Sequence, residues 1–171
     1  SRKLNEACIK QRPHMPNMED LINRISTEIS KSEDEELWIT KIDLDYAYGQ
    51  MELDPETSKH CVFSLVGGKV SGFYRFLKGF YGLSELPTIF QNKIDRTLKF
   101  KTPAWLDDII IVTRGQKENH INEVEEILKI LQETGYRAGK NKTEFCMKET
   151  VWLGHHISKD GIKPNEEKTR S

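Results

Sequence analysis

The sequence predicts an α+β domain in which helices cover one face of an antiparallel sheet and leave the other face free to hold a substrate. Three observations lead to this prediction. Short β-branched runs lie between segments whose apolar residues repeat at helical spacing. Neighbouring β runs are joined by short polar or glycine-containing stretches, which is the spacing of hairpins. The predicted order is strand, strands, helix, hairpin, helix, strands, so consecutive strands can pair antiparallel.

The first part of the chain contains one predicted helix and one predicted strand. Asn17, which follows Pro16, is a candidate N-cap for the helix. The segment Ser32 to Glu36 is an acidic linker, and Trp38 to Leu44 has the β-branched composition of a strand. The apolar residues that repeat at helical spacing after Asn17 are Leu21, Ile22, Ile25 and Ile29.

The middle of the chain predicts a strand pair followed by a helix. Cys61 to Leu65 and Gly72 to Leu77 are the two strands, with a turn at Gly67-Gly68-Lys69 between them. The helix is predicted from Pro87 to Leu98, with Ser84 as candidate N-cap. Its expected apolar stripe consists of Ile89, Phe90 and Ile94.

The last part of the chain predicts a hairpin, a helix and a second hairpin. Apolar runs flank Asp107-Asp108, and aspartate favours turns over strand interiors, so the pair is expected at or near a hairpin tip. An amphipathic helix follows from His120 to Thr134, and Gly135 is a natural stop. The run Val151 to Ser158, with a turn before Ile162, predicts the second hairpin. The apolar face of the helix contains Ile121, Val124, Ile127, Leu128 and Leu131.

Composition places the chain among single soluble domains. It has 171 residues, of which 36% are hydrophobic and 31% charged, and we interpret it as a soluble piece of a longer polypeptide. It shows no signal peptide, and no apolar stretch approaches the length of a membrane span. The widely spaced Cys8, Cys61 and Cys146 suggest neither disulfides nor a zinc site, and we expect reduced thiols in an intracellular, cytoplasmic protein.

Charge is distributed unevenly along the chain, although the formal net charge of -1 does not indicate a nucleic-acid binder. Residues 33–60 hold nine acidic and two basic residues, whereas residues 61–106 hold seven basic and two acidic ones. This division could place a carboxylate cluster beside a surface that attracts phosphates. The alternative is that the two blocks solvate different faces, and charge alone does not decide between them.

The paired carboxylates of Asp107-Asp108 are the sharpest chemical feature. Most such pairs are solvated turns, but carboxylates between apolar strands repel each other unless cations neutralise them, and Mg²⁺ prefers such hard oxygen ligands. Asp43 ends the predicted 38–44 strand, and three carboxylates could hold two metal ions for phosphoryl transfer. Asp45 shares a strand face with Asp43 by period two, so spacing does not choose between them.

Five segments, in this order, resemble the motifs of reverse transcriptases from gypsy-type LTR retrotransposons and, more distantly, of retroviral enzymes. The likeness covers nearly the whole chain, and its strength lies in the order of the motifs. The segments are Ser1-Arg2-Lys3-Leu4-Asn5, like the Arg-x-Leu-Asn element of the fingers; Lys41-Ile42-Asp43-Leu44 with Ala47-Tyr48, like the first catalytic motif; Gly82-Leu83 with Pro87 and Phe90-Gln91, like the Pro-Phe-Gly-Leu element; Trp105-Leu106-Asp107-Asp108, like the Tyr-x-Asp-Asp box; and Phe145-Cys146 with Trp152-Leu153-Gly154-His155 and Gly161-Ile162, like the primer-gripping hairpin.

The resemblance implies a role for each matched residue. Asp43, rather than Asp45, would join Asp107 and Asp108 in a catalytic triad that binds two Mg²⁺ ions, with Mn²⁺ as an alternative. The backbone carbonyl of Leu44 would contribute to the metal site. The nucleotide-binding residues would be Tyr48, Tyr81 and Gly82, with Tyr48 excluding a 2′-hydroxyl; spacing alone favours a core aromatic there. The primer-binding residues would be Trp105, Leu106, Leu153 and Gly154. His155 and His156 would point to opposite faces of a strand and so would not share a metal.

The same resemblance implies a polymerase palm of the ferredoxin-like split βαβ type. Residues 1–36 and 55–80 would be partial fingers, residues 37–54 and 81–150 the palm, and residues 151–171 the primer-grip hairpin with the start of the thumb. The departures from the family pattern are Trp105 for tyrosine, Phe80 for proline and Leu86 for alanine. The rest of the thumb, the connection and the ribonuclease H region would lie outside this chain.

The implied activity is RNA-directed DNA polymerisation: a primer 3′-hydroxyl attacks the α-phosphate of a deoxynucleoside triphosphate (dNTP) on an RNA or DNA template. The implied partners are therefore the template with its DNA primer, the dNTP and the remaining regions of the parent polyprotein. A virus-like particle would be the setting for an active element. Two alternatives remain: a catalytically inactive palm-like remnant that binds nucleic acid or protein, and a metal-dependent nuclease that uses the same carboxylates.

Overall fold

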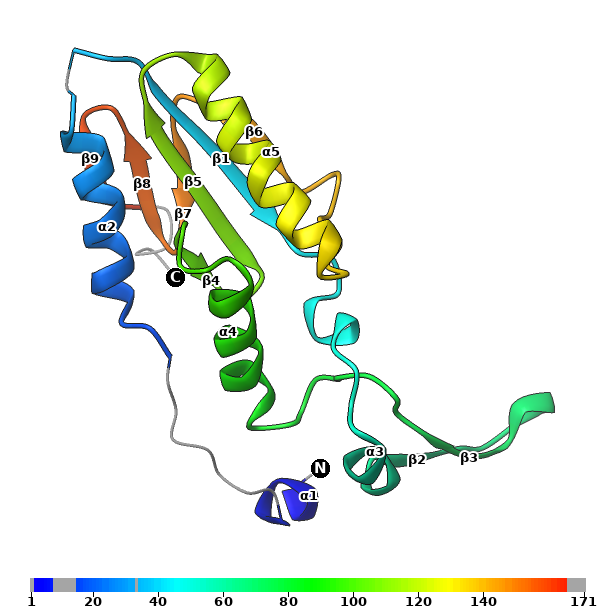
Figure 1. Ribbon diagram of the computed structural model, residues 1–171. Helices are drawn as coiled ribbons and strands as arrows, with labels where there is room; N and C mark the ends of the chain where they lie inside the picture. Colours follow the sequence, from blue (N-terminus) through cyan, green and yellow to red (C-terminus); the bar gives the residue numbers. More distant parts are fainter. Residues whose placement is uncertain (1, 8–14, 33, 166–171) are drawn as a thin grey trace. The chain divides into compact units, whose positions relative to one another are not determined.

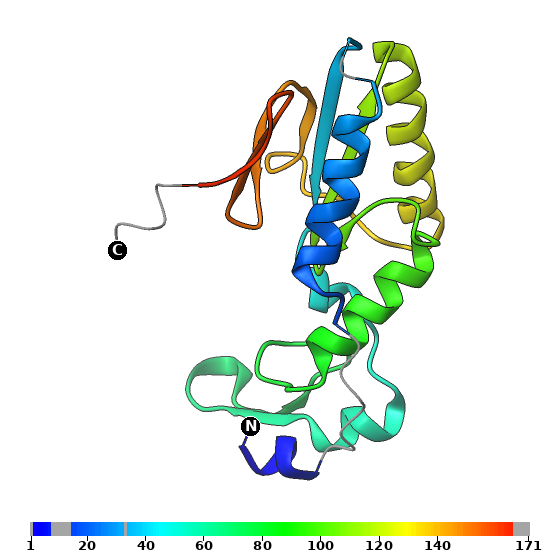
Figure 2. The same cartoon turned by 90° about the vertical axis from the view of Figure 1, so that its left-hand side faces the viewer.

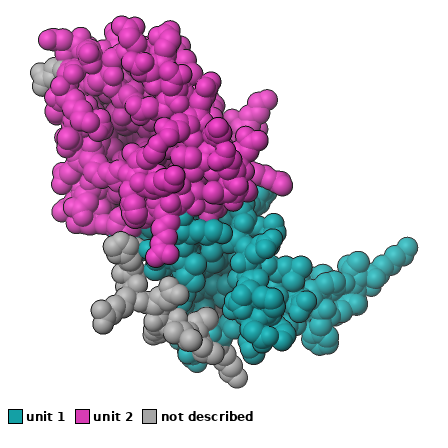
Figure 3. Space-filling view, viewed as in Figure 1, with its two compact units in different colours: residues 1–15, 46–93 teal, residues 16–45, 94–171 magenta. Residues whose placement is uncertain are grey.

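The computed structural model describes residues 2–7, 15–32 and 34–165. The chain divides into two compact units, shown in Figure 3: unit 1 combines residues 1–15 with 46–93, and unit 2 combines residues 16–45 with 94–171. Ser1 of the first motif, Cys8, and residues 166–171 of the expected thumb start lie outside the described residues. Within the described ranges, no helix is long and apolar enough to cross a membrane.

Unit 2 is built on a four-stranded antiparallel sheet with the strand order β4-β5-β1-β6, in which β1 and β5 run side by side (Figure 1). The strands are β1 (Leu37–Asp43), β4 (Ala104–Trp105), β5 (Asp108–Arg114) and β6 (Glu144–Met147). Helix α4 (Leu86–Thr97) precedes β4, and α5 (Lys117–Glu133) precedes β6. This β-α-β-β-α-β succession and strand order are those of the ferredoxin-like split βαβ fold. The predicted α+β class is confirmed.

Different elements cover the two faces of this sheet, as Figure 2 shows. Helix α5 packs on β1, β5 and β6 through its buried residues Val124, Ile127 and Leu131. Helix α2 (Met18–Ser30) packs against β5 on the opposite face, so this face, which the sequence suggested would be free, is partly covered. As predicted, Asn17 is the N-cap of α2, and its Oδ1 accepts from the Glu19 N–H at 3.1 Å.

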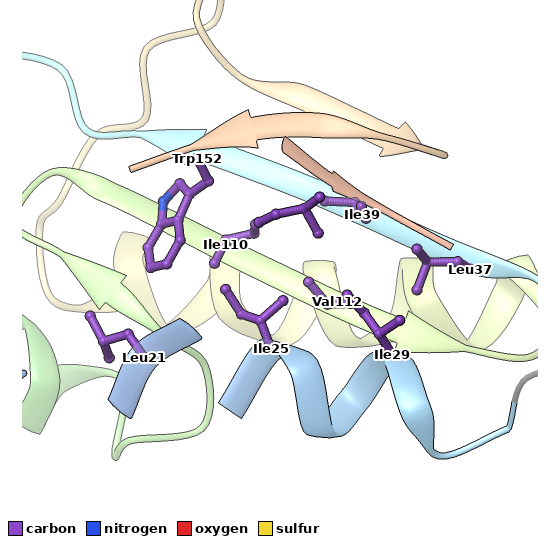
Figure 4. Close-up of a cluster of buried hydrophobic side chains, with 9 residues drawn as sticks. Leu21, Ile25, Ile29, Leu37, Ile39, Ile110, Val112 and Trp152 are labelled. Atoms are coloured by element: carbon purple, nitrogen blue, oxygen red, sulfur yellow. The ribbon is translucent and has the colours of Figure 1, made fainter. Parts of the chain in front are cut away.

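An apolar cluster packs on the α2 face of the sheet (Figure 4). It joins one side of α2 to alternate residues of β1 and β5 and to the strands that follow β6. Because side chains of a strand alternate between faces, the residues of β1 and β5 in this cluster belong to the same face. The buried members are Leu21, Ile25, Ile29, Leu37, Ile39, Ile110, Val112, Trp152 and Ile157.

The carboxyl-terminal part forms a separate three-stranded sheet of β7 (Thr150–Trp152), β8 (His155–Ser158) and β9 (Gly161–Pro164). The single strand that the sequence predicted from Val151 to Ser158 is therefore wrong, because the chain turns at Leu153-Gly154. Trp152 pairs with His155, and the two turn residues have φ angles of 48° and 76°. Positive φ at both central residues defines a type I′ turn, which usually selects asparagine or glycine at the position of Leu153.

Unit 1 contains α1 (Arg2–Ala7), the 3-10 turn η1 (Ala47–Gln50), α3 (Pro55–His60), β2 (Val62–Leu65), the 3-10 turn η2 (Gly68–Val70) and β3 (Gly72–Arg75). The predicted strand pair is confirmed, with Val62 opposite Arg75. Helix α3 was not predicted, although Asp54 caps it and Pro55 opens it. Phe80 stacks on Phe76 with ring centroids 4.0 Å apart.

The boundary between the two units falls within α4, and this helix differs in detail from the prediction. It begins at Leu86, so Ser84 is not its N-cap; the Ser84 N–H instead donates to Asn5 Oδ1 at 3.1 Å. Phe90 and Ile94 are buried as expected. Ile89 is 37% exposed, so it does not belong to the buried stripe.

Candidate functional site

The carboxylates singled out from the sequence lie together at one end of the unit 2 sheet. Asp43 is the last residue of β1 and stands directly opposite Asp108, the first residue of β5. Paired residues of antiparallel strands project from the same face, so both side chains leave the sheet on one side. Asp107 immediately precedes Asp108. Asp45 lies beyond the end of β1, where its backbone N–H donates to the Arg137 carbonyl at 2.9 Å.

The β4–β5 hairpin presents Asp107 on a tight and strained turn. Trp105 pairs with Asp108, which leaves Leu106 and Asp107 as the two turn residues. Leu106 has a φ of 54°, a conformation that costs a residue with a side chain about 1 kcal/mol. The Leu44 N–H donates to the Asp107 carbonyl at 2.9 Å, which ties the turn to the end of β1.

A loop between α5 and β6 closes this end of the sheet and brings in a cation. The Gly139 N–H donates to the Asp43 carbonyl at 2.8 Å, and Leu44 forms a β-bridge with Ala138. Three residues later, Lys142 Nζ lies 3.0 Å from Asp43 Oδ1. Hydrogen bonding and ion pairing with Asp43, with smaller effects of Asp45 and Asp107, raise the pKa of Lys142.

The electrostatics of the three aspartates favour the binding of a cation among them. Burial raises the pKa of Asp108, and the negative charges of Asp107 and Asp43 raise it further. Lys41 and Lys142 act in the opposite direction, but they do not cancel the rise. A divalent ion among these groups would relieve their mutual repulsion.

The donor set suits Mg²⁺, because it consists of hard carboxylate oxygens with backbone carbonyls close by. Across the described ranges, no group of three or more His, Cys, Asp or Glu side chains is gathered closely enough to hold a metal ion. Asp43 is engaged by Lys142, so a metal ion at this carboxylate would have to take it from the lysine. The donor atoms of the site therefore suit Mg²⁺, and the carboxylate side chains would have to turn toward one another to bind the ion.

The residues predicted to contact a primer lie in the same unit as the carboxylates. Trp105 of β4 and Leu153 of the β7–β8 turn are both partly buried against the apolar cluster under α2. Leu106 and Gly154 are the neighbouring turn residues, each with positive φ. Two tight turns with strained or glycine backbone are thus anchored on one core. His155 and His156, in β8, have separate partners in the Leu153 carbonyl and Glu149.

The residues predicted to bind a nucleotide lie in unit 1 and contact one another. The ring of Tyr48, in η1, packs edge-on against Tyr81 at 5.3 Å between centroids and against Phe90 at 5.7 Å. Gly82 has a φ of 106°. Asn5 holds this loop: its Nδ2 donates to the Gly82 carbonyl at 2.8 Å. The first and third sequence motifs therefore meet in unit 1.

Two structural requirements of these sites had no signal in the sequence. A Cβ on Gly79 would lie 2.5 Å from the Tyr48 carbonyl oxygen, so only glycine fits beside the tyrosine. Lys142 was not singled out, since its partner Asp43 is 99 residues away and one lysine in a polar loop has no local pattern.

A cavity of about 390 Å³ between α2 and β5 is lined by none of the three aspartates.

Comparisons with known proteins find similar sequences and similar folds. The sequence model of the family described as reverse transcriptase (RNA-dependent DNA polymerase) matches residues 1–157. The chain is 34% identical over 174 aligned positions to the retrovirus-related Pol polyprotein from transposon 297 of Drosophila melanogaster. It is 30% identical to the Pol polyprotein from transposon gypsy of the same organism. Each alignment covers 99% of this chain but only 15% and 16% of the relatives, so the chain spans a small part of their length.

Solved structures share the fold at low sequence identity. The foamy viral protease-reverse transcriptase in complex with an RNA/DNA hybrid superposes with a TM-score of 0.81 over 97% of this chain and 21% of that chain. The same protein in complex with double-stranded DNA gives 0.75 over 98% of this chain and 33% of that chain. The sequence identities are 17% and 18%, so these superpositions speak for the fold alone.

Proposed function

Since the chain belongs to the reverse transcriptase (RNA-dependent DNA polymerase) family, we propose that it forms the polymerising centre of a longer Pol polyprotein. The observation that carries the proposal is the pairing of Asp43 with Asp108 across β1 and β5, with Asp107 in the adjoining turn. The reaction is attack of a DNA primer 3′-hydroxyl on the α-phosphate of a dNTP, directed by an RNA or DNA template, with release of pyrophosphate.

Within this proposal Asp43, Asp107, Asp108 and the Leu44 carbonyl hold the metal ions. Two Mg²⁺ ions, or Mn²⁺, would supply charge neutralisation of the phosphates and activation of the attacking oxygen. The chain's own contribution is to hold the backbones of Asp43 and Asp108 on two paired strands, so that only the side chains have to turn to bind the ions. The raised pKa of Asp108, caused first by burial and then by Asp107 and Asp43, supports this assignment, because cations would offset the repulsion between the carboxylates.

The remaining site residues are assigned by the same proposal. Trp105, Leu106, Leu153 and Gly154 place the primer end from two tight turns whose residues have positive φ. Tyr48, Tyr81 and Gly82 bind the nucleotide, and the flat ring of Tyr48 excludes a ribose 2′-hydroxyl. Trp105 presents a larger surface than the family's tyrosine and lacks its hydroxyl, so its primer contact is apolar stacking with one N–H donor.

The fingers and palm assignment also belongs to the proposal. Unit 2, with the split βαβ sheet and the carboxylates, corresponds to the palm, and β7–β9 corresponds to the primer grip. Unit 1 contains residues 55–80 of the expected fingers, with β2 and β3, together with residues 46–54 and 81–93, which the resemblance assigns to the palm. Helix α2 packs on β5, so we place residues 16–36 with the palm rather than with the fingers.

Primer extension with an Asp107→Asn variant tests the function. In the longest natural polypeptide that carries these residues, extension of a DNA primer on an RNA template should require Mg²⁺ or Mn²⁺. Asp107→Asn should lower kcat at least about 1,000-fold, because it removes a metal-binding charge. The exposed Asp34→Asn, which lies before β1 and outside the proposed sites, is the matched control, and circular dichroism should show both variants folded.

Three results would reject the proposal. Wild-type extension rates in Asp107→Asn would show that the carboxylate is not catalytic. Degradation of the template without added dNTP, abolished by the same substitution, would identify a metal-dependent nuclease. A folded wild-type polypeptide that neither extends nor degrades would leave the inactive remnant as the function.

A further inference from the structure

His120 is a buried ionisable group that the proposed chemistry does not use. It lies in α5 and is fully buried, at 0% exposure. Its Nε2 lies 2.8 Å from Thr40 Oγ1 in β1, and its Nδ1 lies 2.7 Å from Thr113 Oγ1 in β5. A neutral imidazole has one donor and one acceptor nitrogen, and a hydroxyl can take either role, so the neutral ring can bridge both threonines. His120 thereby links the two strands that carry Asp43 and Asp108.

Thr40 has a second partner in a third strand. Its Oγ1 accepts from the Cys146 N–H at 3.1 Å. The register between β1 and β6 shifts at this point, because Ile39 pairs with Met147 whereas Lys41 pairs with Glu144. Two residues of β6 therefore face one residue of β1, which is a β-bulge.

The bulge leaves the Cys146 N–H without a backbone partner in the ladder between β1 and β6. Cys146 has a φ of 52°, an unfavourable conformation for a residue with a side chain. A bulged amide that finds no hydrogen bond would be costly here, because it is partly buried. The Thr40 hydroxyl supplies the bond, and His120 in turn fixes the orientation of that hydroxyl.

The bulge also decides where the preceding loop meets the carboxylates. On the amino-terminal side of the bulge, the Gly139 N–H donates to the Asp43 carbonyl, and Lys142 pairs with Asp43 Oδ1. Without the extra residue, the part of β6 before the bulge would slide by one position, about 3.3 Å along β1, and its side chains would change face. The loop that leads into β6 would then move away from its contacts with Asp43.

We propose that His120 is a positioning residue that, through the Thr40 hydroxyl, holds the β6 bulge and so seats the Gly139–Lys142 loop on Asp43. The structural part stands on the contacts of His120, Thr40 and Cys146. The catalytic consequence, that this seat keeps Asp43 in its working position, rests on the proposed function. Thr113 holds the other side of the imidazole ring.

Hydrogen exchange of the loop tests the structural part without any activity. Thr40→Val keeps the shape of the side chain and removes the hydroxyl, and Thr40→Ser restores the hydroxyl as matched control. His120→Phe keeps a ring and removes both nitrogens. Well below the unfolding temperature, Thr40→Val and His120→Phe should raise exchange about tenfold in peptides covering residues 139–147. Residues 150–158 should exchange as in wild type, and Thr40→Ser should resemble wild type throughout.

Primer extension in the full natural polypeptide tests the catalytic part. Thr40→Val should lower kcat about tenfold and leave KM for dNTP within about twofold, because it displaces a metal-binding residue and not the nucleotide pocket. Thr40→Ser should restore kcat. A residue with a purely structural role would lower thermal stability without changing kcat in the folded variant.

The outcomes are distinct. Wild-type exchange over residues 139–147 in both Thr40→Val and His120→Phe would overturn the proposal, as would equal impairment in Thr40→Ser. Faster exchange with unchanged kcat would overturn the catalytic consequence. If the wild-type chain does not extend primers, the proposed function fails. The exchange experiment still tests whether His120 and Thr40 hold the Gly139–Lys142 loop on Asp43. Should Thr40→Val not fold, Thr113→Val, which leaves the Cys146 bond intact, should give a smaller rise in exchange over the same residues.

Discussion

At the scale of single residues, the proposed metal site already contains a competing cation. Lys142 occupies one oxygen of Asp43, while its side chain remains 61% exposed. An exposed ion pair of this kind is weak, so the lysine can be displaced. It neutralises part of the negative charge in the absence of metal and must withdraw when a divalent ion binds to the same oxygen.

Replacement of Lys142 should therefore tighten divalent-ion binding in the absence of nucleotide. We expect Lys142→Met to lower the apparent Kd for Mn²⁺, followed by paramagnetic resonance, by about threefold, which is the size of effect of a weak surface pair. Lys140→Met, in the same exposed loop, is the control for net charge. Weaker Mn²⁺ binding in Lys142→Met than in Lys140→Met would contradict the competition.

A second residue-scale prediction concerns Gly79 and the proposed nucleotide pocket. An added Cβ would lie 2.5 Å from the Tyr48 carbonyl oxygen and 3.0 Å from Leu86 Cδ2, so Tyr48 must move. Gly79→Ala should cost about 1–3 kcal/mol of stability, as other overpacked positions do. It should also weaken discrimination between deoxy- and ribonucleotides in primer extension.

Gly49→Ala is the matched control for this prediction. Its added Cβ would meet only the Tyr46 Cβ at 3.8 Å, an ordinary contact. Unchanged nucleotide discrimination in Gly79→Ala, together with the expected loss of stability, would separate the packing of Tyr48 from the proposed role in sugar selection.

The position of Asp107 and Asp108 in a hairpin was predicted correctly, because this signal is local: the two residues are adjacent, and apolar runs flank them. Spacing did not choose between Asp43 and Asp45, since both fit a period of two, and only the motif resemblance selected Asp43. Strand pairing puts Asp43 opposite Asp108 and leaves Asp45 beyond the strand end. Lys142 was missed because its role depends on a distant partner.

At the scale of elements, α5 is attached to the sheet by more than apolar packing. His120 is near the start of this helix and binds threonines of β1 and β5. Burial lowers the pKa of His120 from 6.5 to about 4. The folded protein therefore keeps this ring neutral at pH values where the unfolded chain would protonate it.

The stability of unit 2 should fall as the pH decreases from about 6.5 to about 4. In this pH range the unfolded state binds one more proton than the folded state. The stability that depends on neutral His120 is therefore fully present above the pKa of His120 in the unfolded chain, and it is lost as the pH falls to the pKa of His120 in the folded protein. The shift in the pKa of His120 corresponds to a loss of about 3 kcal/mol in the free energy of unfolding. All three tryptophans lie in unit 2, so urea unfolding followed by tryptophan fluorescence reports this unit.

His120→Phe provides the comparison, because it removes the titrating ring while every other group remains. The variant should lose less stability than wild type between pH 6.5 and pH 4.5. Parallel stability curves for the two proteins over this range would show that another group causes the acid sensitivity.

Elements were predicted well where composition and periodicity agree, as in β1, α2 and the β2–β3 pair. The β7–β8 turn was missed because Leu153 occupies a left-handed position that glycine or asparagine normally marks. Helix α5 begins at Lys117, three residues before the predicted start, because its first turn is polar and shows no apolar period. Local sequence does not contain the tertiary contacts that decide such cases.

At the scale of the whole molecule, the two units differ in how they are stabilised. Most of the buried apolar residues belong to unit 2, where two faces of a four-stranded sheet are covered. Among the described residues of unit 1, the buried apolar ones are Ala47, Met51, Cys61, Leu86 and Phe90. Its only sheet among the described residues is the two-stranded β2–β3 pair, in which Phe73 is 85% exposed.

This difference predicts two classes of amide protection. An isolated two-stranded sheet is marginally stable, so amides of residues 62–75 should exchange by local opening while the rest of the chain stays folded. Amides of β1 and β5 should exchange only on unfolding of unit 2, because both strands are paired and buried. Hydrogen exchange followed by mass spectrometry should show protection factors at least about 100-fold higher for residues 37–43 and 108–114 than for residues 62–75. Equal protection in the two sets would mean that unit 1 opens only when unit 2 does, and that its few buried side chains stabilise it more than their burial indicates.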